Sequence, residues 1–153
     1  MHISGIFLIL MMNMIEVKNV TEEQDLNKVF EIRRIVFVGE QNCPPELEWE
    51  NEDVSHHFLA TYNGLPAGAC RWRKTDNGFK LERFCVLKEF RGKGIAQKMV
   101  QTVLEHLPTD ADYIYLNAQL EAMSLYSKFN FIAEGPQFEE AGIQHFKMVL
   151  HQA

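Results

Sequence analysis

Hydrophobic and polar residues alternate along several short segments of this chain, which is the pattern of half-buried β-strands. The turn sequences Asn63-Gly64 and Asp76-Asn77-Gly78 separate such segments and are typical of β-hairpins. We therefore expect three hairpin-linked strands in the middle of the chain. The full set of expected strands covers residues 14–18, 57–62, 66–74, 79–87, 112–117, 131–133 and 143–151.

Three further segments show the helical spacing of apolar residues. In the first, Thr21 stands at the N-cap position, Gln24 follows three residues later, and Gly39 is expected to end the helix. The second runs from about residue 92 to residue 106, and the third from residue 119 to residue 129. This order of elements predicts an α+β fold, with a mostly antiparallel central sheet of about six or seven strands flanked by helices.

Length and composition limit the classes of function. The 153 residues suit one domain, and a hydrophobic content of 46% is enough to build a core. The net charge of −6 argues against nucleic acid as a partner, because nucleic-acid binding requires a basic face. Basic residues nevertheless gather around residues 88–98, which suits a small anionic ligand.

The N-terminus carries the apolar run Ile6–Met12. This run is much shorter than the ~20 residues of a membrane span. It also lacks the basic and small-residue flanks of a secretory signal. We therefore expect an apolar N-terminal extension over residues 1–13, a single domain over residues 14–153, and no membrane partner.

The cysteines and neighbouring histidines give no metal pattern. Cys43, Cys70 and Cys85 have spacings that match no zinc site, so we expect reduced thiols in a cytoplasmic protein. Cys70 and Cys85 lie in strand-like runs and are expected in the core, whereas Cys43 lies in an expected loop and could be exposed. His56 and His57 are neighbours on one expected strand and would face opposite sides of it. We therefore expect no metal.

The strand expected at residues 79–87 passes into the next helix through Arg91-Gly92-Lys93-Gly94-Ile95-Ala96. A turn of this kind leaves backbone N–H groups pointing outward at a helix N-terminus, where the helix dipole adds partial positive charge. The segment therefore predicts a binding site for a phosphate or pyrophosphate group. It lacks the spacing of the nucleoside triphosphate loop and the third glycine of the dinucleotide fingerprint.

The pattern that this loop does match is R-x-x-G-x-A, formed by Arg91, Gly94 and Ala96. It resembles the pyrophosphate loop of the GNAT superfamily, the acetyl-CoA-dependent N-acetyltransferases. The resemblance implies acetyl-CoA as co-substrate and a sheet whose strands part beside residues 84–86 to admit the pantetheine arm. The residues that it implies for coenzyme A binding are Phe84, Val86, Arg91, Gly92, Lys93, Gly94, Ile95, Ala96, Gln119 and Tyr126.

A second match lies in residues 119–131, which resemble the family pattern N-x-x-A-x-x-[LF]-Y-x-x-x-G-F. Gln119 stands in the place of Asn, and Asn130 in the place of Gly. Taken alone, Tyr126 would be interpreted as a core residue of an amphipathic helix. Together with the loop, the resemblance implies that Tyr126 is the general acid that protonates the departing sulfur of coenzyme A.

Two longer matches point to the ElaA-like branch of the superfamily. Residues 33–44 resemble its R-x-x-V-F-x-x-E-Q-x-x-P opening, and residues 138–148 resemble its F-x-E-x-G-I-x-H-x-x-M ending. They imply a small acetyltransferase of one domain. The residues expected to bind the acceptor substrate are Arg33, Glu40, Glu48 and His57, with an Arg33–Glu40 ion pair across the cleft as an alternative role for the first two.

The acceptor would be an amine that is protonated at neutral pH, so a base must remove a proton before attack. Candidate bases are Glu40, Glu48, Glu82, His57 and His145. Glu82 lies on the strand that leads to the loop, and His145 belongs to the residue type that titrates near neutral pH. We therefore expect Tyr126, Glu82 and His145 to be the catalytic residues.

Other interpretations of the same residues are possible at this point. Cys85 could form an acyl intermediate, although no histidine stands beside it in the sequence. The chain could also be a non-catalytic sensor of acyl-CoA or an interaction domain in which the loop is only a turn. The sequence favours the primary amine of a small molecule as acceptor without identifying it. The apolar N-terminus and the long C-terminal strand are compatible with a homodimer.

Overall fold

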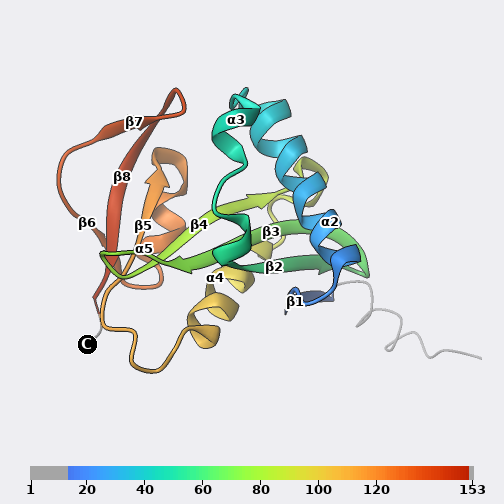
Figure 1. Cartoon of the computed structure of the whole chain (residues 1–153), viewed down its shortest axis with the longest axis horizontal. Coiled ribbons are helices and arrows are strands. Elements are labelled where there is room, and N and C mark those ends of the chain that lie inside the picture. The colour runs from blue at the N-terminus through green and yellow to red at the C-terminus, as the bar shows by residue number, and fades with distance from the viewer. Residues whose placement is uncertain (1–13, 152–153) are drawn as a thin grey trace, which may run out of the picture.

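A central sheet of eight strands runs through the part of the chain that the computed structural model describes, residues 14–151 (Figure 1). The strands are β1 (Ile15–Asn19), β2 (Ser55–Tyr62), β3 (Leu65–Lys74), β4 (Phe79–Val86), β5 (Ile114–Gln119), β6 (Phe131–Ala133), β7 (Phe138–Glu140) and β8 (Ile143–Leu150). The helices are α2 (Glu23–Arg33), α3 (Pro45–Glu48), α4 (Ile95–His106) and α5 (Met123–Ser127). A π-helical segment (Arg34–Glu40) continues α2, and short 3₁₀ turns cover Glu52–Val54, Lys88–Phe90 and Leu120–Ala122.

The strands follow the order β1-β2-β3-β4-β5-β8-β6, and β7 pairs with the other end of β8. All these pairs are antiparallel except β4 with β5. The parallel pairing joins Phe79–Leu81 only to Ile114–Leu116, and beyond it the two strands part. The sheet therefore opens at the end of β4, as the family resemblance implies.

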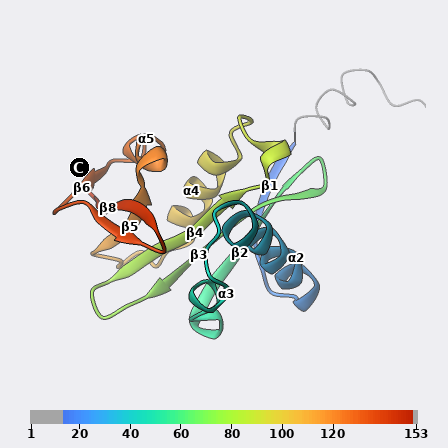
Figure 2. The ribbon, with the colours of Figure 1, turned by 90° about the horizontal axis from the view of Figure 1, so that it is seen from above.

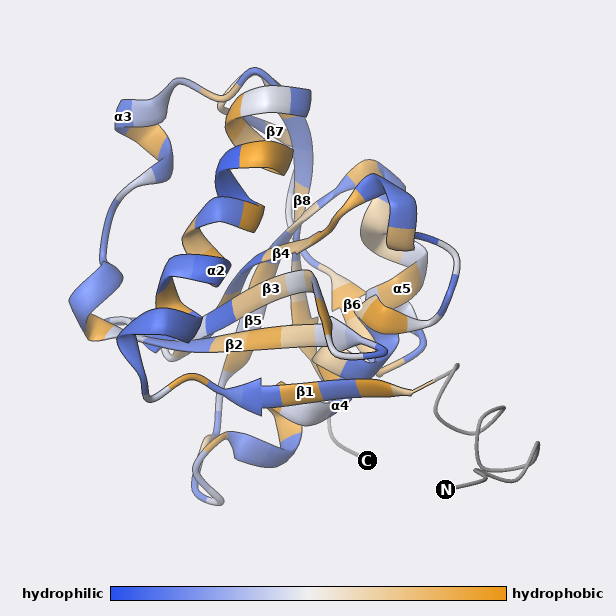
Figure 3. Ribbon diagram, turned by 90° about the vertical axis from the view of Figure 1, so that its right-hand side faces the viewer, coloured by the Kyte–Doolittle hydropathy of each residue, from blue (hydrophilic) through white to orange (hydrophobic). Residues whose placement is uncertain are grey.

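Helices α2 and α4 cover opposite faces of the sheet (Figure 2). Strand alternation divides the core accordingly: Phe58 and Ala60 pack in the cluster on the α4 side, and Leu59 packs in the cluster with Val29 of α2. Figure 3 shows hydrophobic residues through the middle of β2 and β3, which lie between these two layers. Each fully buried aliphatic side chain stabilises the fold by about 1.5–3 kcal/mol.

Local turn signals predicted the hairpins well. The Asn63-Gly64 turn has φ angles of 51° and 84°. Two positive φ angles are required by the type I′ hairpin turn, which favours the sequence Asn-Gly. Asn130 has a φ of 70°, as its place in the family pattern implies. Eight strands stand where about six or seven were expected, because residues 138–140 form a short strand rather than a loop.

The first helix differs from its expected limits. It begins at Glu23 after Glu22, whose side chain makes no capping hydrogen bond, so the expected Thr21 cap is wrong. Gly39 does not end the helix, because the π-helical segment runs through it to Glu40. The turn away from the helix falls instead at Asn42, with a φ of 56°.

The cysteines are all free thiols within the described residues. Cys70 and Cys85 lie in the core as expected, but Cys43 is also buried, with 8% of its surface exposed. Cys43 lies in a loop, as expected, but it is not exposed, since it packs in the cluster beside α2. The expected extension at residues 1–13 lies outside the described residues. No helix in residues 14–151 has the length and apolar character needed to cross a membrane.

Candidate active site

A groove of about 550 Å³ lies between the start of α4 and the segment that leads into α5. Gly92 and Gly94 line it with φ angles of 79° and 88°, which favour glycine. A Cβ atom added to either glycine would have no atom within 4 Å, so the space above the loop is open. The first N–H groups of α4, on Ile95 and Ala96, have no partner inside the helix and lie at its positive end. This arrangement fits a bound pyrophosphate.

The basic residues of the loop have other roles. Arg91 Nε donates to the carbonyl oxygen of Val86 at 2.9 Å, and its Nη2 pairs with Glu40 at 2.8 Å. The backbone N–H of Arg91 donates to the Lys88 carbonyl, so it is not free for a ligand. Lys93 does not line the groove, and its Nζ lies 5.2 Å from the centre of the Tyr62 ring. Sequence reasoning missed Lys128, which directly follows α5 and does line the groove.

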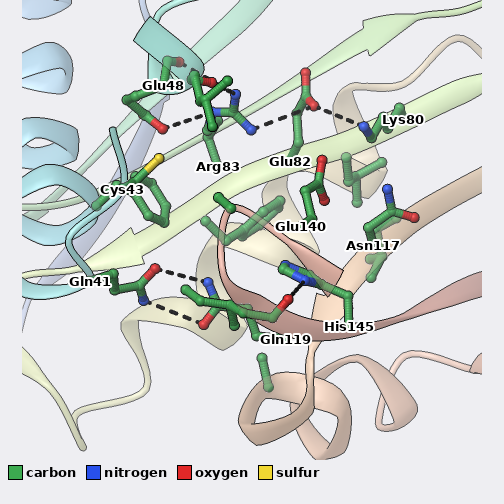
Figure 4. A pocket seen from close by; sticks show the side chains of 18 of the residues that line it. Gln41, Cys43, Glu48, Lys80, Glu82, Arg83, Asn117, Gln119, Glu140 and His145 are labelled. Atoms are coloured by element: carbon green, nitrogen blue, oxygen red, sulfur yellow. Dashed lines mark hydrogen bonds and ion pairs between the residues drawn. The ribbon is translucent and has the colours of Figure 1, made fainter. Parts of the chain in front are cut away.

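A second cavity, of about 260 Å³, opens where β4 and β5 part (Figure 4). Ala122 lines both spaces, so the groove and the cavity adjoin at this residue. Several residues predicted from the sequence meet here: Phe84, Gln119, Tyr126, Glu82, His145 and Glu48 all line the cavity. The groove holds most of the other predicted coenzyme A residues, namely Val86, Arg91, Gly92, Gly94, Ile95 and Ala96.

Tyr126 is 6% exposed and packs edge-on against Phe84 and Phe131. Its hydroxyl makes no hydrogen bond within residues 14–151, and the residue lines the cavity. Burial raises the pKa of this phenol well above its usual value. Tyr126 therefore stays protonated at neutral pH, in the form that can donate a proton.

His145 lies on β8 with 7% of its surface exposed. Its Nδ1 lies 2.7 Å from the carbonyl oxygen of Ile143, and a carbonyl can only accept, so Nδ1 carries the proton. Its ring stacks on Phe138 at 5.6 Å between ring centres. These two contacts hold the ring at the cavity wall, and in a neutral imidazole protonated on Nδ1 the lone pair is on Nε2.

Glu82 is held by cations. Arg71 Nη2 lies 2.8 Å from its Oε1 and Lys80 Nζ 3.3 Å from its Oε2, and Arg73 Nε also bonds to Oε1. Burial acts to raise the pKa of Glu82, but the charges of Arg71, Lys80 and Arg73 outweigh it and lower the pKa to about 2. A carboxylate of that pKa is a weak base near neutral pH, so Glu82 is poorly suited to the proton removal expected of it.

Arg33 lies away from the cavity. It is 1% exposed and pairs with Glu48 at 2.8 Å and Glu52 at 2.7 Å, so it fixes the loop that follows the π-helical segment. The position of Arg33 therefore does not agree with the expectation that it binds substrate. The alternative Arg33–Glu40 ion pair is wrong, because Glu40 pairs with Arg91. His57 also lies outside the cavity lining, on the face covered by α2, where its Nε2 lies 3.0 Å from the Glu52 carbonyl oxygen.

Glu48 reaches the cavity but is already paired. Its Oε1 accepts from Arg33, and its Oε2 lies 3.2 Å from Nε of Arg83. Burial raises the pKa of Glu48 against the opposing effect of these two guanidinium groups. Arg83 has a φ of 60°, and the pairing register between β3 and β4 shifts here, which marks a β-bulge. The bulge costs about 1–2 kcal/mol in backbone strain and directs Arg83 toward the loop that carries Glu48 and Glu50.

Sequence reasoning left several polar lining residues of the cavity unassigned, among them Gln41, Asn117 and Glu140. Gln41 and Glu140 were visible in the two branch patterns, and Asn117 ends a strand next to Gln119. The acyl-enzyme alternative loses support here, since Cys85 packs in the α2-side cluster and burial raises the pKa of its thiol to about 12. A thiol of that pKa offers little thiolate at neutral pH.

Residues 23–152 match the family model for the acetyltransferase (GNAT) domain. The chain belongs to the GNAT family. Its curated relatives include the uncharacterized N-acetyltransferase YjcF of Bacillus subtilis (strain 168), 37% identical over 131 residues, which cover 83% of this chain and 93% of YjcF. ElaA of Escherichia coli (strain K12) is 30% identical over 133 residues, covering 80% of this chain and 85% of ElaA.

Solved structures agree with this assignment. The crystal structure of Escherichia coli ElaA superposes with a TM-score of 0.79 at 28% identity, covering 90% of this chain and 100% of ElaA. A GNAT family acetyltransferase from Elizabethkingia anophelis with acetyl-CoA bound has a TM-score of 0.71 over 90% of this chain and 98% of that one, at 13% identity. The GNAT fold and the resemblance to the ElaA-like branch are therefore confirmed, and the chain is an N-acetyltransferase.

Proposed function

We propose that this GNAT enzyme transfers the acetyl group of acetyl-CoA directly to the primary amine of a small molecule. The observation that carries the proposal is the junction of the two spaces. The glycine loop at the start of α4 opens into one of them, and Tyr126 and His145 line the other. A donor lying along the groove would place its thioester near Ala122, where both spaces meet.

The groove supplies the donor site. The open space above Gly92 and Gly94 leaves room for the pyrophosphate, and the first N–H groups of α4 would bind its oxygens. Lys128 lines the same groove and adds a positive charge. Beyond the loop, the pantetheine arm would run past Val86 to Gln119, between the separated strands. The family pattern has asparagine at this position, and Gln119 keeps the side-chain amide group.

The cavity supplies the proton transfers. His145 Nε2 accepts a proton from the bound ammonium group, which frees the nitrogen lone pair for attack on the thioester carbonyl. The new C–N bond forms as the C–S bond breaks, and Tyr126 donates its hydroxyl proton to the departing sulfur. The amine nitrogen then loses its second proton to solvent. Glu82 and its cations act here by holding the wall of the cavity.

The cavity also bears on the acceptor. Its volume of about 260 Å³ is below the roughly 300–1,000 Å³ of drug-sized ligand sites. A small molecule fills such a space more readily than a folded protein surface. The sensor alternative gives no reason for an unpartnered Tyr126 hydroxyl in the same cavity as a histidine of fixed tautomer.

Thermal unfolding with and without acetyl-CoA tests the donor site. At 100 times its dissociation constant, a ligand stabilises the native state by about 2.7 kcal/mol. We expect acetyl-CoA to raise the unfolding temperature of the wild type and to leave that of Gly94→Asp unchanged. The new carboxylate would occupy the phosphate position and repel the phosphate. Release of free thiol on addition of amines then tests transfer.

Gly135→Asp is the matched control. Gly135 has a φ of 83° and, like Gly94, no atom within 4 Å of an added Cβ, but it lies between β6 and β7 outside the groove lining. It therefore reproduces the backbone strain and the charge without touching the donor site. Equal acetyl-CoA shifts in Gly94→Asp and Gly135→Asp would contradict the proposed pyrophosphate site.

A further inference from the structure

We propose that Glu140 binds the ammonium group of the acceptor, and that the acceptor is a compact alkylamine with no negatively charged group. This inference rests on the proposed function, because it concerns the cavity assigned there to the acceptor. Three features carry it: which cavity charges are already paired, where the β7–β8 hairpin places Glu140, and the size and lining of the space.

The first feature is the pairing of the cavity carboxylates. Glu82 is paired with four cations, and Glu48 lies between Arg33 and Arg83. Glu50 Oε1 lies 3.4 Å from Nη2 of Arg83. Glu140 makes no hydrogen bond or ion pair with any residue of the described range. Among the described residues of the cavity wall, Glu140 therefore carries the one negative charge that remains available to a ligand.

The second feature is the geometry of the hairpin. Glu140 stands opposite Ile143, and Phe138 stands opposite His145. Side chains of paired residues share a face of the sheet and alternate along each strand, so Glu140 and His145 lie on the same face. Figure 4 shows both around the same space, together with Asn117. An ammonium group held by Glu140 would therefore lie on the wall that carries the accepting nitrogen of His145.

The tip of the hairpin is fixed against the opposite wall. Ala141 and Gly142 form its two-residue turn, with φ angles of 51° and 79°. The first angle is unfavourable for a residue with a Cβ atom. Ala141 nevertheless lines the cavity and packs against the cluster that contains Phe37 and Cys43. The methyl group gives the tip an apolar contact that glycine would lack, and this contact keeps Glu140 over the cavity.

The third feature limits the rest of the acceptor. Phe37, Leu47 and Ile143 give the cavity an apolar side suited to a short alkyl chain. Four carboxylates line the space against the two cations Lys80 and Arg83, and both cations are engaged by those carboxylates. A carboxylate or phosphate on the acceptor would meet the unpaired charge of Glu140, and among the described lining residues it would find no free cation to pair with. The lining therefore selects for a cation and against a zwitterion.

The test measures binding in the absence of acetyl transfer. Amide chemical shifts are followed in protein saturated with free coenzyme A while n-butylammonium, 4-aminobutanoate or 1-butanol is added. These probes share a four-carbon chain and differ in charge. Three proteins are compared: wild type, Glu140→Gln and Glu139→Gln. Glu139 is the neighbouring carboxylate on the opposite face of β7 and is exposed like Glu140, so it controls for the loss of one charge.

We expect n-butylammonium to shift the amides of residues 140–145 in the wild type and in Glu139→Gln. Its affinity should fall about tenfold in Glu140→Gln, and 4-aminobutanoate and 1-butanol should bind more weakly than n-butylammonium to the wild type. Equal affinity in all three proteins, shifts elsewhere, or tighter binding of 4-aminobutanoate would overturn the assignment. Calorimetric titration with coenzyme A is run in parallel. If coenzyme A fails to bind, the proposed function fails, whereas bound coenzyme A without an effect of Glu140→Gln overturns only the present inference.

Discussion

The side-chain amides of Gln41 and Gln119 bond to each other in both directions. Gln41 Nε2 donates to Gln119 Oε1 at 3.3 Å, and Gln119 Nε2 donates to Gln41 Oε1 at 3.0 Å (Figure 4). Gln41 follows the π-helical segment and Gln119 ends β5, so the pair joins the two halves of the chain where the sheet opens. Two amides that satisfy one another can equally satisfy an amide of a pantetheine arm.

The two glutamines should therefore respond differently to substitution. Gln41→Ala removes the competing partner and leaves Gln119 free for the donor, so we expect acetyl-CoA to bind as tightly as to the wild type or a few fold more tightly. Gln119→Ala breaks the same pair but also removes the amide that would contact the donor. We expect it to weaken binding by about two- to tenfold, since a hydrogen bond contributes about 0.5–1.5 kcal/mol. Isothermal titration calorimetry with acetyl-CoA measures the affinity of both variants. An equal loss of affinity in the two variants would contradict the assigned roles.

Tyr126→Phe should separate catalysis from stability. General acid catalysis contributes about 10²–10⁴-fold to a rate, so we expect kcat to fall by about 10²-fold or more. The free energy of unfolding should change little, because the hydroxyl has no hydrogen-bond partner in the described chain and the ring contacts with Phe84 and Phe131 remain. Steady-state kinetics and chemical denaturation measure the two quantities. A variant that loses stability and keeps its rate would show that Tyr126 is a core residue.

His145→Asn removes the proposed base while keeping a donor near the position of Nδ1 for the Ile143 carbonyl oxygen. We expect kcat to fall by about 10²-fold, with acetyl-CoA affinity unchanged because His145 lies outside the groove. Added imidazole should restore part of the rate in His145→Ala, where a space for it is left. An unchanged rate in both variants would place proton removal on another group.

Residues whose conformation depends on their neighbours in sequence were predictable. The Asn63-Gly64 turn, the left-handed Asn130 and the glycine loop at the start of α4 all follow from local backbone preferences. Alternation along β2 likewise separated His56 from His57, which face opposite sides of the sheet. The fold class followed from these local signals, and the family resemblance added the parting of β4 from β5.

Charge pairing was not predictable, because it depends on contacts between distant segments. Arg33 pairs with Glu48 and Glu52 rather than with Glu40. Glu40 pairs with Arg91, which is 51 residues away in the sequence. The weakness of Glu82 as a base has the same origin, because its cations come from two different strands. The left-handed backbone of Arg83 has no sequence signal either, since an arginine normally avoids that conformation.

The ion pairs of Glu82 should appear in the pH dependence of stability. Its pKa is about 2 in the folded state against 4.5 as the ordinary value, so the unfolded chain binds the proton more readily. The stabilisation is therefore complete above about pH 4.5 and is lost as the pH falls toward 2. A shift of this size corresponds to about 3 kcal/mol at neutral pH.

Glu82→Gln should accordingly lower the free energy of unfolding by about 3 kcal/mol at pH 7, because it leaves the buried guanidinium of Arg71 without its charged partner. The difference from the wild type should shrink as the pH falls from 4.5 toward 2. Glu89→Gln is the control, since Glu89 is exposed and forms no ion pair with a described residue. Urea denaturation at pH 7 and pH 3 measures these values. A loss that is equal at both pH values would mean that Glu82 acts through packing rather than through its charge.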